Sequence, residues 1–275
     1  LEYYGKVSYL KAGLAYADRI TTVSPTYARE IQESGERGFG FEGLLRRRSS
    51  VLSGVLNGLD TETWDPDRDA SLPSRFGPSD APAGKAVCKE ALQRECGLEV
   101  RRDRPLIGVV SRLDYQKGLD LALPALEPLL GRSQLVVLGT GDPSLTESLA
   151  ALERRHPGAV HFHRSFDETF AHRVYAASDF FLMPSRSEPC GLGQMIAMRY
   201  GAVPVAARTG GLVDTVFEDD AAGRPANGFL CAPNDQASLS EALGRAVGAY
   251  RGPRWDALVR AAMAGDFSWD RSVES

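Results

Sequence analysis

The chain has 275 residues, 43% of them hydrophobic and 25% charged, and its 32 basic and 36 acidic side chains leave a net charge of −4. This composition is typical of a globular protein with one large or two smaller domains. The near balance of charge offers no basic field for nucleic acid, and no apolar stretch reaches the ~20 residues that span a bilayer. We therefore expect neither nucleic acid nor a membrane as a partner.

The first 56 residues carry little more than one β-α pattern. VSYLKAGLAYAD predicts a helix, RITTVS a strand, and SPTYAREIQES a second helix with Ser24 as its cap and Pro25 at its first position. This is too little to close a core, so we expect residues 1–56 to be the end of a domain whose beginning is absent. A first residue other than Met also hints at a fragment.

A different composition follows the segment GVLNGLD. The stretch WDPDRDASLPSRFGPSDAPAGK is rich in Pro, Asp and Ser, and it predicts an excursion over the surface. From about Pro105 short apolar runs alternate with helical patterns of ten or more residues. The strand-like runs are PLIGVV, QLVVL, AVHFH, DFFLM and AVPVAA. Such alternation predicts β-α-β units and an α/β fold with a parallel, doubly wound sheet.

In a doubly wound sheet, ligands bind beyond the carboxyl ends of the strands. The first loop at such an end is SRLDYQKGLD, in which Arg112 and Lys117 lie five residues apart. A planar guanidinium and a mobile ammonium that point into one crevice suit a diphosphate. The alternative is a pair of surface cations neutralised by Asp114 or Asp120.

Three further loops follow predicted strands. Gly139 and Gly141 in LGTGD permit a tight turn and close approach of the backbone to a ligand, although a plain turn has the same sequence. Gly210 and Gly211 in RTGGLVD form a loop of the same kind.

The remaining loop, PSRSEPCGLG, combines a carboxylate with glycines. We predict that Cys190, Gly191 and Leu192 begin a helix, whose free N–H groups favour a phosphate. Glu188 would repel that phosphate, so we expect it to serve sugar hydroxyls beside it. Together the four loops favour a nucleotide-sugar site.

Cysteine and histidine point to neither a disulfide nor a metal site. The four cysteines show no Cys-x-x-Cys pair and no metal-ligand spacing, which suits a reducing compartment. His161 and His163 have no third ligand nearby in sequence. We expect no metal and no cofactor.

Long motifs in this order match a known family. They are KAGLAYADRITTVSPTYAREI, VLNGLDTETWDP, SRLDYQKGLDL, LGTGD, PSRSEPCGLGQMIAMRYGAVPV and RTGGLVDTV, and they run from end to end. The chain resembles the bacterial glycogen synthase and plant starch synthase family of retaining glucosyltransferases. The resemblance implies two Rossmann-like domains that face each other across a cleft. Residues 1–56 would end the N-terminal, acceptor-side domain, and residues 57–275 would form the C-terminal domain that binds the nucleotide sugar.

The resemblance also implies roles for particular residues. Arg112 and Lys117 would hold the diphosphate, and Glu188 would contact the glucose hydroxyls, so these three are the predicted catalytic residues. The predicted substrate-binding residues are Asn57 at the hinge, Phe166 against the adenine, and Gly118, Gly139, Gly141, Cys190, Gly191, Leu192, Thr209, Gly210 and Gly211 in the loops.

The implied reaction moves glucose from ADP-glucose to the non-reducing end of an α-1,4-glucan, glycogen or starch, with retention. The family's N-terminal Gly-rich loop has no counterpart here, and the family normally continues into a further helix after DFSWDRSVES. We therefore expect that the missing N-terminal domain is needed for a complete cleft and that the isolated chain is inactive. Two alternatives stay open: a non-catalytic nucleotide-sugar or glucan-binding module, and a related transferase that uses UDP-glucose. The expected location is the cytoplasm or the plastid stroma.

Overall fold

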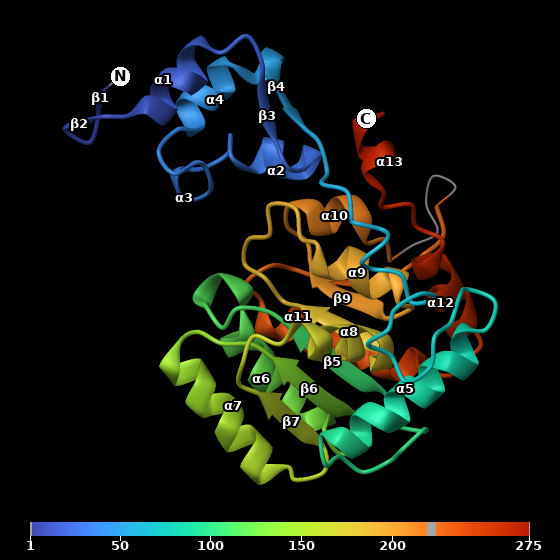
Figure 1. The fold of residues 1–275 in the computed structure, drawn as a ribbon. Coiled ribbons are helices and arrows are strands. Elements are labelled where there is room, and N and C mark those ends of the chain that lie inside the picture. The colour runs from blue at the N-terminus through green and yellow to red at the C-terminus, as the bar shows by residue number, and fades with distance from the viewer. Residues whose placement is uncertain (1, 219–223, 275) are drawn as a thin grey trace.

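A computed structural model describes residues 2–218 and 224–274, and its largest feature is a six-stranded parallel sheet (Figure 1). The strand order is β10-β9-β8-β5-β6-β7. The strands are β5 (Leu106–Val110), β6 (Gln134–Leu138), β7 (Val160–His163), β8 (Phe180–Met183), β9 (Val203–Ala207) and β10 (Phe229–Cys231). The chain starts in the middle, winds outward through β6 and β7, then returns to β8 and winds the other way. The predicted doubly wound α/β fold is confirmed.

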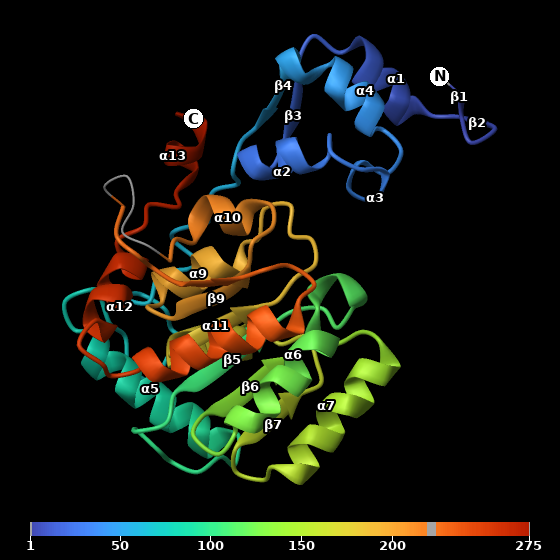
Figure 2. The same ribbon diagram turned by 180° about the vertical axis from the view of Figure 1, so that it is seen from behind.

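Helices cover both faces of this sheet, as a buried parallel sheet requires. One face carries α5 (Ala81–Glu95), α8 (Glu168–Ala177) and α9 (Gly193–Arg199), and the opposite face carries α6 (Leu119–Leu126), α7 (Pro143–Arg155) and α11 (Gln236–Ala249) (Figures 1 and 2). Side chains alternate between the two cores along each strand: Ile107 and Val109 face one core and Leu106 the other. The shorter elements here are η2 (Tyr115–Lys117), η3 (Glu127–Leu129), α10 (Gly211–Thr215), α12 (Trp255–Met263) and α13 (Trp269–Val273).

The stretch from Trp64 to Lys85 is only partly the surface excursion that its composition predicts. Phe76 is 1% exposed, and α5 already begins at Ala81. The Asp69 carboxylate is buried and accepts a hydrogen bond from Tyr200 at 2.7 Å, while it also contacts His172 Nδ1 at 2.6 Å. The expectation was wrong here because Phe76 packs against α5, while Asp69 contacts α8 and the residue after α9.

The elements between residues 2 and 54 lie outside the six-stranded sheet, and we call them the small N-terminal unit. The strands β3 (Ile20–Thr22) and β4 (Leu52–Gly54) pair in parallel, with α2 (Pro25–Glu30) between them in sequence. As predicted, the Ser24 side chain accepts a hydrogen bond from the Tyr27 N–H at 2.8 Å, and Pro25 is the first helical residue. The remaining elements are β1 (Glu2–Tyr3), β2 (Lys6–Val7), α1 (Tyr9–Tyr16), α3 (Gly35–Gly38), α4 (Glu42–Arg47) and η1 (Ser49–Val51).

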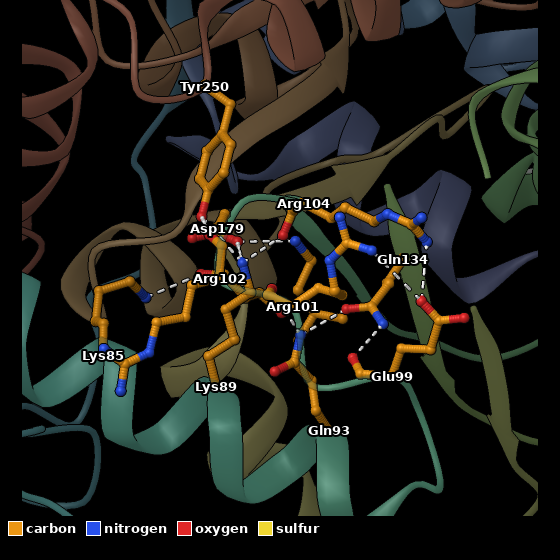
Figure 3. A network of polar contacts seen from close by, with 12 residues as sticks. Lys85, Lys89, Gln93, Glu99, Arg101, Arg102, Arg104, Gln134, Asp179 and Tyr250 are labelled. Atoms are coloured by element: carbon orange, nitrogen blue, oxygen red, sulfur yellow. Dashed lines mark hydrogen bonds and ion pairs between the residues drawn. The ribbon is translucent and has the colours of Figure 1, made fainter. Parts of the chain in front are cut away.

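A buried polar network lies beneath the amino ends of β5 and β8 (Figure 3). Lys85 donates to three backbone carbonyls at 2.8 to 2.9 Å, and Lys89 forms an ion pair with Asp179 at 2.6 Å. Both lysines lie on the buried face of α5. Burial lowers the pKa of Lys85 to about 8, and the charge of the nearby Asp179 carboxylate opposes this shift. The network thus joins α5 to the sheet by polar contacts.

Across residues 2–218 and 224–274, no helix is both long and apolar enough to cross a membrane. The same residues contain no group of three or more His, Cys, Asp or Glu side chains arranged to hold a metal ion. His161 and His163 instead lie near Glu153 at 3.4 Å and Asp167 at 3.7 Å, respectively.

Candidate active site

The strand order reverses between β5 and β8, and a cavity of about 280 Å³ lies at the carboxyl ends of these two strands. We call it the switch-point crevice. It is lined by Val109, Val110, Ser111, Arg112, Lys117, Leu119, Tyr175, Leu182, Met183, Pro184, Ser185, Glu188, Leu192, Gly193 and Ile196. A larger cavity of about 530 Å³ lies beside Lys89 and Asp179, near the amino ends of the strands. We place the candidate site in the smaller cavity, because ligands of open α/β sheets bind at the carboxyl ends.

The loop after β5 brings two predicted cations to this crevice. Asp114 caps η2 by accepting from the Lys117 N–H at 3.1 Å, which fixes the backbone that carries the lysine. The Lys117 side chain is 19% exposed, whereas the Arg112 side chain is 72% exposed and lies 3.2 Å from the Asp114 carboxylate. Arg112 therefore lies at the edge of the crevice and forms a surface ion pair with Asp114, as the alternative interpretation of this loop predicted.

Lys117 and Glu188 form an ion pair that sequence reasoning missed. Lys117 Nζ lies 2.7 Å from Glu188 Oε2, and the Ser185 hydroxyl donates to the same oxygen at 2.9 Å. Glu188 is 7% exposed, so the ammonium compensates a carboxylate that has lost most of its water. The two residues are 71 positions apart, and only the sheet order brings them together.

A second set of polar contacts joins the loops after β5 and β8. The Arg186 guanidinium forms a two-pronged ion pair with Asp120, each N–H···O distance being 2.7 Å. This pairing holds the pKa of Asp120 below its usual range. Gln116 adds a hydrogen bond to the Ser187 carbonyl at 2.9 Å. Sequence reasoning named Asp120 only as an alternative partner for Arg112 or Lys117, and it missed Arg186 and Gln116. The one available signal was that these residues lie in the two segments already singled out.

The helix of the CGLGQ stretch begins later than predicted. It starts at Gly193, with Leu192 at the cap position, and Gly191 has a φ of +74° that a helix does not allow. Cys190 and Gly191 instead form a turn, with the Gln194 amide donating to the Gly191 carbonyl at 2.9 Å. In the described part of the chain no acceptor contacts the N–H of Gly191 or Leu192. These N–H groups thus remain available beside the crevice.

The predicted glycines serve contacts between loops. A Cβ on Gly118 would lie 2.1 Å from the Pro184 carbonyl oxygen, and Gly118 has a φ of +69°. A Cβ on Gly139 or Gly141 would lie 2.1 or 2.2 Å from a carbonyl oxygen of the loop after β5. The close approach that sequence reasoning assigned to a ligand is therefore made by neighbouring backbone.

The same holds for the loop after β9. Thr209, Gly210 and Gly211 are all buried. The Gly210 N–H donates to Glu30 at 3.0 Å, and the Gly211 N–H donates to the Glu188 carbonyl at 3.1 Å. The loop lies against the turn that carries Glu188, and protein groups occupy these donors.

Two predicted residues lie at the margins. Asn57 is half-buried, and its backbone forms a hydrogen bond with the Cys190 thiol. Burial raises the pKa of that thiol, although the hydrogen bond opposes the shift. Phe166 follows β7, two strands from β5, and its side chain is 92% exposed. Of the predicted residues, the crevice lining thus contains Arg112, Lys117, Glu188 and Leu192. It lacks the others, which are Asn57, Gly118, Gly139, Gly141, Phe166, Cys190, Gly191, Thr209, Gly210 and Gly211.

A doubly wound sheet places the chain among the α/β proteins, and the lysine, arginine and buried carboxylate lie at its switch point, where such folds bind their ligands. The chain belongs to the family described as "Glycosyl transferases group 1", whose model matches residues 104–248. The model described as "Starch synthase catalytic domain" matches residues 1–47.

Individual relatives agree with the resemblance to glycogen and starch synthases. Over 274 residues the chain is 47% identical to a glycogen synthase of Elusimicrobium minutum, and over 275 residues it is 52% identical to one of Anaeromyxobacter dehalogenans. Each match covers 99% of this chain and 57% of the relative, so the chain spans little more than half of these proteins. The solved catalytic domain of starch synthase IV from Arabidopsis thaliana, bound to ADP and acarbose, is 38% identical with a TM-score of 0.89; the match covers 96% of this chain and 55% of that one.

Proposed function

We propose that this chain forms the donor-binding part of a retaining glucosyltransferase that moves glucose from ADP-glucose to the non-reducing end of an α-1,4-glucan. The observation that carries the proposal is the Lys117–Glu188 pair at the switch point. The supporting relatives are glycogen synthases, and the solved relative is a starch synthase bound to ADP.

The hydrogen-bonding capacity of the pair fits a sugar diphosphate. An ammonium has three donors, and Lys117 uses one of them on Glu188, which leaves two for phosphate oxygens. Glu188 uses Oε2 for both of its contacts, and no donor among the described residues contacts Oε1. A glucose hydroxyl can donate to that oxygen. At the same time Lys117 neutralises the charge of Glu188, which reduces the repulsion between the carboxylate and the diphosphate.

Departure of ADP builds negative charge on the diphosphate as the anomeric carbon becomes oxocarbenium-like. Lys117 and Arg112 stabilise that charge, since preplaced cations act mainly on the transition state. Arg112 reaches the phosphates by leaving its exposed contact with Asp114, which costs little at a solvated pair. The N–H groups of Gly191 and Leu192, which have no acceptor among the described residues, can supply further donors.

We further propose the domain division at residue 56. The β3–β4 sheet is separate from the six-stranded sheet, and this supports assigning residues 1–56 to the acceptor-side domain and 57–275 to the donor-side domain. Asn57 would then stand at the hinge, and Phe166 would stack on the adenine. The described cysteines are all free thiols, which supports a reducing compartment such as the cytoplasm.

Calorimetry with ADP, ADP-glucose and UDP-glucose tests the donor assignment on the 275-residue chain. We expect the adenine nucleotides to bind and UDP-glucose to bind at least about tenfold more weakly. Glu188→Gln keeps the size of the side chain and should retain ADP binding while it weakens ADP-glucose binding. Tighter binding of UDP-glucose would overturn the donor assignment, and unchanged ADP-glucose binding by the variant would remove Glu188 from the sugar site.

Glucose transfer needs the part that the chain lacks relative to its relatives. A chimera in which this chain replaces the matching portion of the Elusimicrobium minutum protein should incorporate radiolabelled glucose from ADP-glucose into glycogen. Glu188→Gln in the chimera should abolish incorporation. An inactive chimera that still binds ADP would favour a non-catalytic binding module.

A further inference from the structure

Helices α2 and α10 lie side by side (Figures 1 and 2). Each contributes a carboxylate that accepts hydrogen bonds at the N-terminal end of the other. At the start of α2, Thr26 donates its N–H to Asp214 at 3.0 Å and its hydroxyl at 2.6 Å. At the end of α2, Glu30 accepts from the Gly210 N–H, which precedes the first residue of α10. The helices therefore run antiparallel, and each supplies a carboxylate to the N-terminal end of the other.

Glu30 is the more deeply engaged of the two carboxylates. It is 6% exposed, it accepts from Gly210 at 3.0 Å, and the Thr209 hydroxyl lies 3.3 Å from both of its oxygens. Arg37, on the same small unit, adds an ion pair at 3.4 Å. A buried carboxylate with these partners is costly to leave unpaired, so the contact fixes the loop after β9 relative to α2.

That loop touches the candidate site without any side chain between. A Cβ on Gly210 would lie 2.1 Å from the Glu188 carbonyl oxygen, and a Cβ on Gly211 would lie 2.0 Å from the Cys190 carbonyl oxygen. The Gly211 N–H also donates to the Glu188 carbonyl at 3.1 Å. A displacement of Gly210 is therefore transmitted directly to the backbone of residues 188–190.

We propose that Glu30 is a positioning residue for the sugar site: through Gly210 and Gly211 it holds the turn that presents Glu188 to the donor. The proposal rests on the proposed function for the identity of the ligand, but its geometric part does not. It assigns the placement of Glu188 to α2, in the small N-terminal unit, as well as to the sheet. A change in the tilt of α2 then changes how the donor sugar is held.

Two variants of Glu30 and one control test this. Glu30→Met keeps the side-chain length and removes both acceptors, whereas Glu30→Gln keeps one acceptor for the Gly210 N–H. Glu33→Gln is the control, because Glu33 is an exposed neighbour that pairs with the same Arg37 at 3.4 Å and does not touch the loop. Calorimetry with ADP and ADP-glucose gives the first readout, and the rate at which iodoacetamide alkylates Cys190, followed by peptide mass spectrometry, gives the second.

We expect Glu30→Met to lower ADP-glucose affinity about tenfold relative to ADP affinity, because a buried N–H loses its acceptor and the turn shifts. It should also make Cys190 react at least about tenfold faster, since local opening of the turn exposes the thiol. Glu30→Gln should show smaller changes in the same direction, and Glu33→Gln should match the unaltered chain.

Three other results would count against the positioning role of Glu30 or against the proposed function. Equal weakening of both nucleotides with unchanged Cys190 reactivity would overturn the positioning role. If the unaltered chain binds neither nucleotide, the proposed function fails, and Cys190 reactivity alone decides whether Glu30 holds the turn. If Glu30→Met does not fold, wild-type behaviour of Glu30→Gln in both readouts overturns the proposal.

Discussion

Lys117 and Glu188 should depend on each other for stability, and a double-mutant cycle measures this dependence. The variants are Lys117→Met, Glu188→Gln and the combination of both. Each substitution removes one charge while it keeps most of the side-chain volume, and the side chains are 19% and 9% exposed. We expect both single variants to lower the free energy of unfolding and the double variant to lose less than their sum.

The distance and the burial give the magnitude. At 2.7 Å the attraction is about 6 kcal/mol for an effective dielectric constant of about 20. Desolvation of the two charges offsets most of this, so we expect a net coupling of about 1–3 kcal/mol. Lys117→Met alone should cost about 3–5 kcal/mol, because it leaves the carboxylate buried with Ser185 as its remaining side-chain partner. Glu188→Gln should cost less, since a lysine side chain can turn its ammonium toward water.

Chemical denaturation followed by circular dichroism measures the free energy of unfolding of each variant. The variants can be compared if this free energy depends on denaturant concentration with the same slope in each. High salt should reduce the coupling only slightly, because buried pairs are screened less than exposed ones. Additive losses, in which the two single variants sum to the double variant within about 0.5 kcal/mol, would contradict the coupling. The pair would then not exist in solution as the structure shows it.

Three further predictions concern pH, backbone and thiols. Burial raises the pKa of Asp69, but hydrogen bonds from Tyr200, Ser71 and His172 outweigh it and hold the pKa below its usual value. The ionised carboxylate therefore stabilises the folded chain fully above about pH 4, and this contribution is lost as the pH falls through the lower folded pKa. Asp69→Asn should reduce the dependence of the free energy of unfolding on pH in this acid range. Gly118→Ala should destabilise the chain by more than Gly97→Ala. Both glycines have positive φ, which costs about 1–2 kcal/mol for alanine, but only the alanine at position 118 would meet a backbone oxygen, so equal losses of unfolding free energy would contradict this prediction. Burial raises the pKa of every described cysteine, to about 12 at Cys96 and about 11 at Cys231. Iodoacetamide should therefore label the folded chain slowly at neutral pH and the unfolded chain much faster, and equal labelling rates would contradict the burial of these thiols.

Much of the fold was predictable because its strands are short and apolar on both faces. The five runs from residue 106 to 207 need no long-range information to be recognised as buried strands. Helix α5 escaped prediction for a physical reason: its buried face carries Lys85, Lys89 and Gln93 four residues apart, where an amphipathic pattern would have apolar residues. Their partners lie on β6, at the start of β8 and at the ends of α8 and α9, so only the tertiary structure accounts for them.

The candidate site was predictable as a set of loops but not as a set of contacts. Sequence reasoning placed Lys117 and Glu188 in one crevice because both follow strands, yet it assigned them to different parts of a ligand. That they pair with each other depends on β5 and β8 being neighbours, which no local pattern encodes. The late start of α9 has a different cause: Gln194 holds the turn at Gly191 from three residues away, and the loop after β9 packs against Cys190.

The glycines around the crevice constrain how this site can change over evolutionary time. At Gly118, Gly139, Gly141, Gly210 and Gly211 a single added carbon would lie 2.0 to 2.2 Å from a carbonyl oxygen of an adjoining loop. A saturation mutagenesis library should therefore be almost empty at these five positions, even for alanine, while Arg112 and Phe166 at the solvent edge accept many replacements in a selection for folding. A new preference among nucleotide-sugar donors can then arise from substitutions of the side chains around the crevice, whereas the backbone beneath them keeps the same conformation.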